Sequence, residues 1–166
     1  WHPILLGVIF KATGSAPLTL QNPAKAAYSI HDFERSARFM GIAYKPPSRF
    51  PLASQNAARA FYWLHGQDCA LARQFARAVY RAFFVDDRDI SSPETVLDIG
   101  AGLGVDREAL AAALQNPEIK ARLKDEVDAA LKVGVFGSPH VIIDGEAFFG
   151  ADRLPQMERW LETGGF

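Results

Sequence analysis

The chain has almost no cysteine, and this scarcity excludes several kinds of chemistry. Cys69 is the only cysteine among 166 residues, so the chain can form no internal disulfide, no CxxC redox pair and no cysteine-rich zinc site. Cys69 begins a helical pattern that continues at Leu71 and Phe75, and we interpret it as a packed structural thiol. So little cysteine is typical of a protein of the reducing cytoplasm.

Neither sign of charge dominates, and no long apolar run is present. Eighteen Lys and Arg residues stand against 19 Asp and Glu residues, and no block of like charge suggests nucleic acid or an anionic membrane as partner. No apolar run approaches the roughly 20 residues that cross a bilayer, and no leader pattern is present. His2, His31 and His65 have no partner at metal-ligand spacing, so no metal site is indicated. We therefore expect a cytoplasmic protein with a small-molecule partner.

About half of the residues are hydrophobic, which is enough for one compact domain with a core and a small subdomain. The apolar segment 2–7 predicts a strand. Caps and periodicity predict helices over 23–41, 54–66, 68–85, 106–114, 116–132 and 152–161, with the second and third forming an antiparallel hairpin. Strands are expected at 140–143 and 146–149, joined by the two-residue turn Asp144-Gly145.

The stretch VLDIGAGLG, residues 96–104, is similar to the strand and glycine loop with which methyltransferases hold S-adenosylmethionine. That interpretation needs a strand here and an acidic residue at the end of a second strand, roughly 20 residues further on. Ser92, Pro93 and Glu94 instead provide an N-cap, a helix-starting proline and an acid in the first turn. We therefore predict a helix, which Gly102 and Gly104 end in left-handed conformation before Asp106 caps the next helix.

The segment GVFGSPHVIIDGEAFFGADRL, residues 134–154, carries the most information about chemistry. Pro139 directly precedes a predicted strand, so the Ser138–Pro139 bond is a candidate for the cis isomer. A cis bond would turn the backbone of Ser138 outward, where its N–H and C=O could pair with an extended peptide ligand. His140 follows this turn, and we expect it at the edge of the pocket that would hold such a ligand.

The predicted hairpin returns the chain to Ala151 and Asp152 at the start of the last helix. Free backbone N–H groups at a helix start favour a carboxylate, and Asp152 can bind an ammonium beside it. Together these groups suit the head of an α-amino acid such as a γ-glutamyl group. A simpler alternative is that Asp152 only caps the helix.

This segment, together with ILLGVIFKATGSAP and NPAKAAY near the start, resembles the 2-hydroxychromene-2-carboxylate isomerases. These are glutathione-dependent enzymes of aromatic catabolism, related to kappa-class glutathione transferases and to the DsbA-like thioredoxin fold. The resemblance covers nearly the whole chain. It implies an α/β fold, namely a thioredoxin-like sheet with an all-helical insertion, and the division into domains 1–50 with 133–166 and 51–132.

The resemblance also implies a glutathione site. It assigns Ser138 to the cysteinyl backbone of glutathione, with Pro139 as the cis residue, and Ala151 and Asp152 to the γ-glutamyl end. Two further residues complete the implied set: Lys25 matches a family lysine near the glycyl end, and Ser15 stands where relatives carry an asparagine. The family serine that stabilises the glutathione thiolate, in a segment like Ser-Pro-Tyr-Ser, has no counterpart here. We therefore expect the first strand and helix, about 30 residues, to lie upstream of Trp1.

The function that follows from the resemblance is isomerisation of 2-hydroxychromene-2-carboxylate to trans-o-hydroxybenzylidenepyruvate, with glutathione as cofactor and an aromatic carboxylate as substrate. The alternatives are a kappa-type glutathione transferase or peroxidase and a non-catalytic DsbA-like binding protein. Relatives are homodimers. The aromatic run Phe61, Tyr62 and Trp63 is consistent with an interface, although packing in the core explains it equally well.

Overall fold

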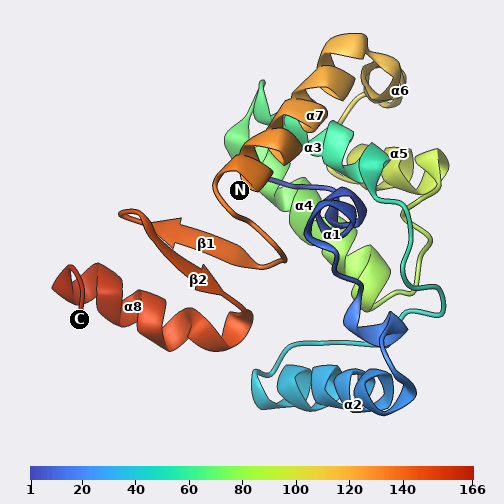
Figure 1. The fold of residues 1–166 in the computed structure, drawn as a ribbon. Coiled ribbons are helices and arrows are strands. Elements are labelled where there is room, and N and C mark those ends of the chain that lie inside the picture. The colour runs from blue at the N-terminus through green and yellow to red at the C-terminus, as the bar shows by residue number, and fades with distance from the viewer.

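A computed structural model describes residues 1–166 and shows a body of packed helices with a smaller lobe beside it (Figure 1). The α-helices are α1 (Leu6–Thr13), α2 (Pro23–Phe39), α3 (Gln55–His65), α4 (Cys69–Phe84), α5 (Pro93–Ala101), α6 (Arg107–Gln115), α7 (Pro117–Lys132) and α8 (Leu154–Thr163). The short 3-10 helices η1 (Leu18–Leu20) and η2 (Ala151–Arg153) precede α2 and α8. Strands β1 (His140–Ile143) and β2 (Glu146–Phe149) form a two-stranded sheet.

One apolar cluster holds the helical body together. α3 and α4 form a helical hairpin, and α5, α6 and α7 pack around it (Figure 1). The cluster contains 20 buried residues, and burying each large side chain stabilises the fold by roughly 1.5–3 kcal/mol. Phe61 and Tyr62 are both 2% exposed, and Trp63 packs against the same cluster. The aromatic run therefore belongs to the core and gives no support for an interface.

The predicted strand at residues 2–7 is wrong. Leu5 is extended, but α1 begins at Leu6 and ends at Thr13, and the next residue, Gly14, has a left-handed φ of 69°. A strand needs a neighbour to take up its backbone hydrogen bonds, and the sheet contains only β1 and β2. The segment is instead held by its contacts with the body, where the Tyr62 hydroxyl donates a hydrogen bond of 2.7 Å to the Pro3 carbonyl.

Two aspartates cap helices as the sequence predicts. The carboxylates of Asp68 and Asp106 accept hydrogen bonds of 2.7 Å from N–H groups two and three residues further on, at the starts of α4 and α6. Ser54 and Ser92 stand at the N-cap positions of α3 and α5, but neither makes a side-chain cap hydrogen bond, so the predicted cap at Ser92 lacks its bond. The helices that they precede nevertheless form, because packing contributes more to helix stability than any one cap.

The glycine stretch is helical, as predicted, and this excludes the strand that a methyltransferase loop would need. α5 spans Pro93–Ala101, and Gly104 adopts the expected left-handed conformation with φ 81°. Gly102 does not: its φ is −62°, because its N–H still donates to the Asp98 carbonyl in the helical pattern. Only one of the two glycines therefore ends the helix by a left-handed turn.

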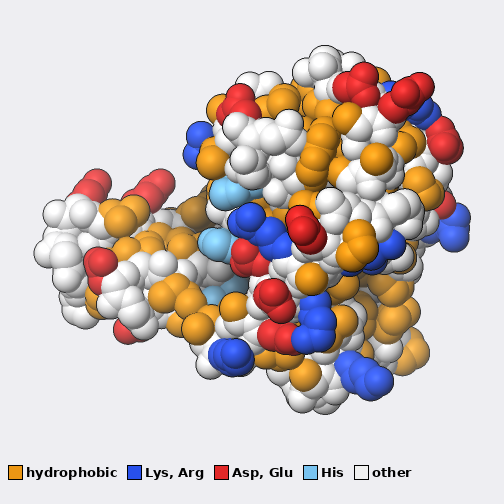
Figure 2. All heavy atoms as spheres, turned by 90° about the horizontal axis from the view of Figure 1, so that it is seen from above, with side chains coloured by type: hydrophobic (Ala, Val, Ile, Leu, Met, Phe, Trp, Pro, Cys, Tyr) orange, Lys and Arg blue, Asp and Glu red, His pale blue; other side chains and the backbone are white.

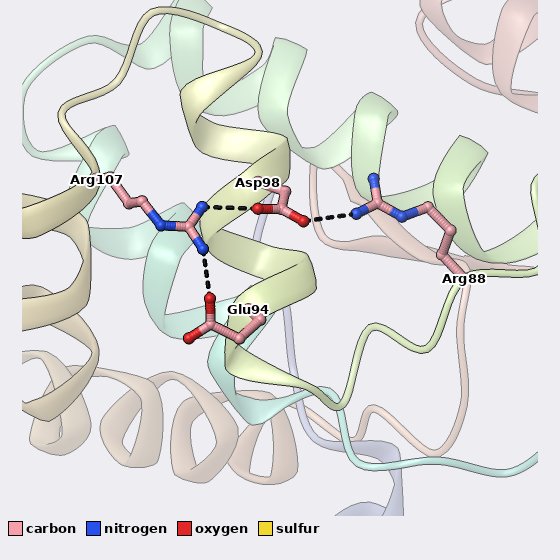
Figure 3. A network of polar contacts seen from close by, with 4 residues as sticks. All are labelled: Arg88, Glu94, Asp98 and Arg107. Carbon is pink, nitrogen blue, oxygen red and sulfur yellow. Dashed lines mark hydrogen bonds and ion pairs between the residues drawn. The ribbon is translucent and has the colours of Figure 1, made fainter.

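An ion-pair cluster ties α5 to its neighbours (Figure 3). Arg107, at the start of α6, donates to Asp98 at 2.7 Å and to Glu94. Arg88, in the connection between α4 and α5, donates to the other oxygen of Asp98 at 3.1 Å. The pKa of Asp98 is lowered, chiefly by the hydrogen bond from Arg107. Asp98 of the glycine stretch thus has a structural partner on each side.

The expected packed thiol at Cys69 is wrong. Cys69 is exposed, and its sulfur lies 3.6 Å from His65 Nε2. The buried face of α4 is formed by Ala72, Phe75, Val79, Ala82 and Phe83. Cys69 is the first residue of the helix and lies to one side of that face, because each residue turns the helix by 100°.

The lobe consists of residues 136–166. β1 and β2 pair antiparallel around the expected Asp144-Gly145 turn, in a register that sets His140 opposite Phe149. η2 and α8 follow, near the predicted helix at 152–161. Phe148 packs its ring against Trp160 of α8, with centroids 5.8 Å apart. No hydrogen bond or ion pair joins the lobe to residues 1–135.

On the face shown in Figure 2, apolar and charged side chains are interspersed. Figure 2 shows apolar side chains spread over body and lobe, with histidine side chains at the junction between the two. None of the helices has the length and hydropathy that crossing a membrane requires. The predicted domains, 1–50 with 133–166 and 51–132, stay a prediction.

Candidate functional site

At the turn that begins the lobe, the backbone N–H and C=O of Ser138 have no hydrogen-bond partner within the protein. The Ser138–Pro139 bond is cis, as the sequence predicts. Ser138 is exposed, and neither its backbone nor its hydroxyl makes a hydrogen bond within the protein. The carbonyl of the next residue, Pro139, accepts a bond of 3.0 Å from the Gly150 N–H. Ser138 therefore presents two donors, its backbone N–H and its hydroxyl, and two acceptors, its carbonyl and its hydroxyl oxygen, along this edge.

The edge continues along β1. Opposite residues of an antiparallel pair alternate between hydrogen-bonded and non-hydrogen-bonded. Since Pro139 bonds to Gly150, the next bonded pairs are Val141 with Phe148 and Ile143 with Glu146. The N–H and C=O groups of His140 and Ile142 hence point away from β2. An extended chain could pair with this edge in the manner of an added strand.

The hydrogen bond from Gly150 to Pro139 brings the start of the last helix beside this turn. Gly150 has φ 101°, a conformation that only glycine adopts readily, and a Cβ there would collide with the Asp152 carboxylate. The N–H groups of Ala151 and Asp152 have no backbone acceptor. The carboxylate of Asp152 pairs with Arg153 at 3.1 Å and is largely exposed. Free donors and a carboxylate therefore lie together, which suits a zwitterionic head group.

Ser15 and Lys25 make no polar contact that links them to the group of Ser138, Ala151 and Asp152 at the start of the lobe, here called the corner. Ser15 follows α1, and its N–H donates to Phe10 at 2.9 Å. Lys25 is in the first turn of α2, where its backbone N–H donates to the Asn22 side chain. Both residues are exposed, and no hydrogen bond or ion pair connects either to the lobe. The structure brings together Ser138, Pro139, Ala151 and Asp152, whereas the roles of Ser15 and Lys25 stay predictions.

An aromatic group beside the turn was not predicted. The rings of Phe136 and Phe149 lie 4.6 Å apart, and each is about half exposed. Gly137 makes this possible, because a Cβ there would lie 2.6 Å from the Phe149 ring. The phenylalanines are 13 positions apart, so only the hairpin register could have revealed their contact. No group of His, Cys, Asp and Glu side chains could hold a metal ion.

Two hollows, one in the body and one in the lobe, are lined by other residues than these free groups. One, of about 320 Å³, is lined by residues of α2 and the segment after it, including Glu34, Arg38 and Tyr44. The other, of about 390 Å³, lies between β2 and α8 beside Trp160 and Phe166. Neither is lined by Ser138, Ala151 or Asp152, although Phe149 and Arg153 line the second. The candidate site is therefore defined by its free backbone groups.

Comparison with known proteins places the chain in a family. The family model described as a DSBA-like thioredoxin domain matches residues 1–162. Glutathione S-transferase kappa 2 of Caenorhabditis elegans is 30% identical over 102 residues, which is 57% of this chain and 45% of that protein. The 2-hydroxychromene-2-carboxylate isomerase of Sphingobium xenophagum is 29% identical over 96 residues, which is 58% of this chain and 48% of that protein. The chain thus spans slightly less than half the length of these relatives.

The fold is also found among solved structures. A 2-hydroxychromene-2-carboxylate isomerase structure superposes with a TM-score of 0.86 at 24% identity, covering 97% of this chain and 78% of that one. The expected fold class, mixed α/β and thioredoxin-like, is therefore confirmed, as is the similarity to the isomerases and to the kappa transferases. With its sequence matched from Trp1 to Glu162, the chain belongs to the DSBA-like thioredoxin domain family.

Proposed function

We propose that this protein is a glutathione-dependent isomerase that interconverts 2-hydroxychromene-2-carboxylate and trans-o-hydroxybenzylidenepyruvate. The observation that carries the proposal is the corner at the start of the lobe. There the unpaired backbone of Ser138 lies beside the free N–H groups of Ala151 and Asp152. Similarity to an isomerase and to kappa transferases supports the same class of activity.

Each group at this corner is proposed to bind one part of glutathione. Ser138 would pair with the cysteinyl main chain, and Pro139 would hold that turn in place. The N–H groups of Ala151 and Asp152 would bind the γ-glutamyl carboxylate, and the Asp152 carboxylate its ammonium. Lys25 and Ser15 are proposed for the glycyl end.

Bound glutathione would supply a thiolate able to add reversibly to the conjugated system of the substrate. The chain's own residues bind and orient the two molecules. Lys25 and Lys11, both exposed, are candidates for attracting the carboxylate of the aromatic substrate, since neither forms an ion pair within the protein.

A second candidate function is a kappa-type glutathione transferase or peroxidase. The 30% identity to a kappa transferase supports this function as strongly as the 29% identity to an isomerase supports the first. Both functions use the same corner, so glutathione binding does not separate them. Turnover of a generic chlorinated aromatic would identify a transferase, and turnover of hydroxychromene carboxylate an isomerase. A non-catalytic DsbA-like binding protein would turn over neither.

Calorimetric titration of glutathione tests the proposal, with S-adenosylmethionine as the parallel ligand. We expect glutathione alone to bind. Asp152→Asn should weaken binding by about tenfold or more, because a hydrogen bond to a charged group contributes roughly 1.5–3 kcal/mol. Asp144→Asn makes the same charge change at the far end of the hairpin and should leave binding unchanged. Absence of glutathione binding to the unaltered protein would refute the proposal.

The proposal includes a cytoplasmic location, where a reduced glutathione pool is maintained, and a homodimer. α2 exposes large apolar side chains that a second copy could cover, Tyr28 and Phe39 on one side of the helix and Ile30 and Phe33 on the other. Phe39 is 89% exposed. Sedimentation of the protein should show a dimer, and Phe39→Ser should shift it toward monomer. A monomer at all concentrations would contradict this part of the proposal.

A further inference from the structure

His140 has two ring nitrogens that the protein leaves without a partner. Both Nδ1 and Nε2 are buried, and neither makes a hydrogen bond. No other side chain in the protein has two such atoms. A neutral imidazole has one donor and one acceptor, and leaving both unpaired away from water costs free energy.

The packing around the ring is aromatic. The Phe136 ring stands perpendicular to the imidazole with centroids 5.5 Å apart, and the Phe149 ring lies at 6.4 Å. These rings offer no strong hydrogen-bond acceptor, so they leave the polarity of the imidazole unmatched. Both phenylalanines are about half exposed, at 47% and 45%.

The hairpin register explains why these groups meet. His140 lies opposite Phe149, and Val141 lies opposite Phe148. Since neighbouring residues of a strand point to opposite faces, Phe148 packs on α8 while His140 and Phe149 lie on the other face. His140 is also two residues from Ser138, so the imidazole and the proposed glutathione edge are adjacent.

We propose that His140 is a substrate-binding residue that hydrogen-bonds an oxygen of an aromatic co-substrate whose ring packs against Phe136 and Phe149. The inference rests on the proposed function, because glutathione on the Ser138 edge would hold the reacting partner beside this group. An aromatic compound that carries a hydroxyl or carboxylate supplies both the ring and the oxygen. To admit it, the half-exposed rings of Phe136 and Phe149 turn toward solvent.

The test uses trans-2-hydroxycinnamate as probe, a stable molecule with an aromatic ring, an ortho hydroxyl and a conjugated carboxylate. Its binding is measured with and without saturating glutathione, while the ¹⁵N resonances of the His140 ring are followed by NMR. We expect the probe to move these resonances. His140→Phe, which keeps an aromatic ring but removes both nitrogens, should weaken probe binding at least tenfold and leave glutathione binding unchanged.

Two further variants keep the test decisive. His140→Gln restores an N–H donor and should recover part of the affinity, and it serves if His140→Phe does not fold. His31→Gln changes an exposed histidine on α2 and should have no effect. If the probe binds His140→Phe within twofold of the unaltered protein, or leaves the ring resonances unmoved, the inference is wrong. If the probe moves the resonances but glutathione does not bind, the inference stands and the proposed function fails.

Discussion

At the scale of single residues, Gly100 explains much of the glycine stretch. It lies on α5, and a Cβ added there would stand 2.5 Å from Leu110 Cδ2 of α6. Gly100→Ala should therefore lower the free energy of unfolding by about 1–3 kcal/mol through overpacking. Gly102→Ala is the matched control, because its Cβ would meet only ordinary contacts at 3.5 Å. Urea unfolding of both variants measures the difference; equal stability would show that α5 and α6 can move apart freely.

The exposed thiol of Cys69 gives a second prediction at this scale. Since the side chain lies outside the buried face of α4, a thiol reagent such as 5,5'-dithiobis(2-nitrobenzoate) should modify it completely in the native protein. Cys69→Ser should leave the unfolding midpoint and glutathione binding unchanged. A thiol that reacts only in denaturant would mean that Cys69 is packed after all, as the sequence pattern suggested.

At the scale of elements, the ion pairs of Figure 3 predict acid sensitivity. The hydrogen bond from Arg107 holds the pKa of Asp98 below its ordinary value of 3.8. A carboxyl with the lower pKa in the folded state stabilises it fully above 3.8, and this contribution is lost as the pH falls through the folded value. Between about pH 6 and about pH 3, the Tm of Asp98→Asn should therefore fall less than that of the unaltered protein.

Asp144→Asn is the control for this measurement, because Asp144 makes no ion pair. Its Tm should follow that of the unaltered protein across the whole range of pH. The exposure of the cluster also makes its contribution sensitive to salt. If Asp98→Asn and Asp144→Asn lose stability in parallel, the cluster does not link α5 to α6 in solution.

The elements also show which parts of the fold the sequence can predict. Local signals sufficed for α2, α4, α6, α7 and the hairpin, where caps such as Asp106 and a two-residue turn act over a few positions. The strand predicted at residues 2–7 was wrong because an apolar run forms a strand only where a neighbouring strand can pair with it. The corner at Ser138 and Asp152 was predictable because it lies within one short segment. The contacts of His140 with Phe136 and Phe149 depend on register and were not.

At the scale of the whole molecule, the body and the lobe differ in how much they bury. The 20-residue apolar cluster lies entirely within residues 9–127, while Phe148 and Met157 are the large buried side chains of the lobe. A two-stranded hairpin on one helix is marginally stable alone. Backbone amides of β1 and β2 should therefore exchange with solvent at least tenfold faster than those of α3 and α4. Equal rates would indicate one cooperative unit.

The same division predicts where a ligand should act. Ser138, Pro139, Ala151 and Asp152 all belong to the lobe, so glutathione bound there stabilises the lobe against local opening. At a concentration of about 100 times Kd this stabilisation is roughly 2.7 kcal/mol, which slows exchange of the β1 and β2 amides by about 100-fold. The amides of α3 and α4 open through the body and should change far less. Exchange measured by mass spectrometry resolves the two regions. Slowing confined to the body would place the site among the helices, whereas slowing in both would mean that glutathione bridges them through Lys25 or Ser15.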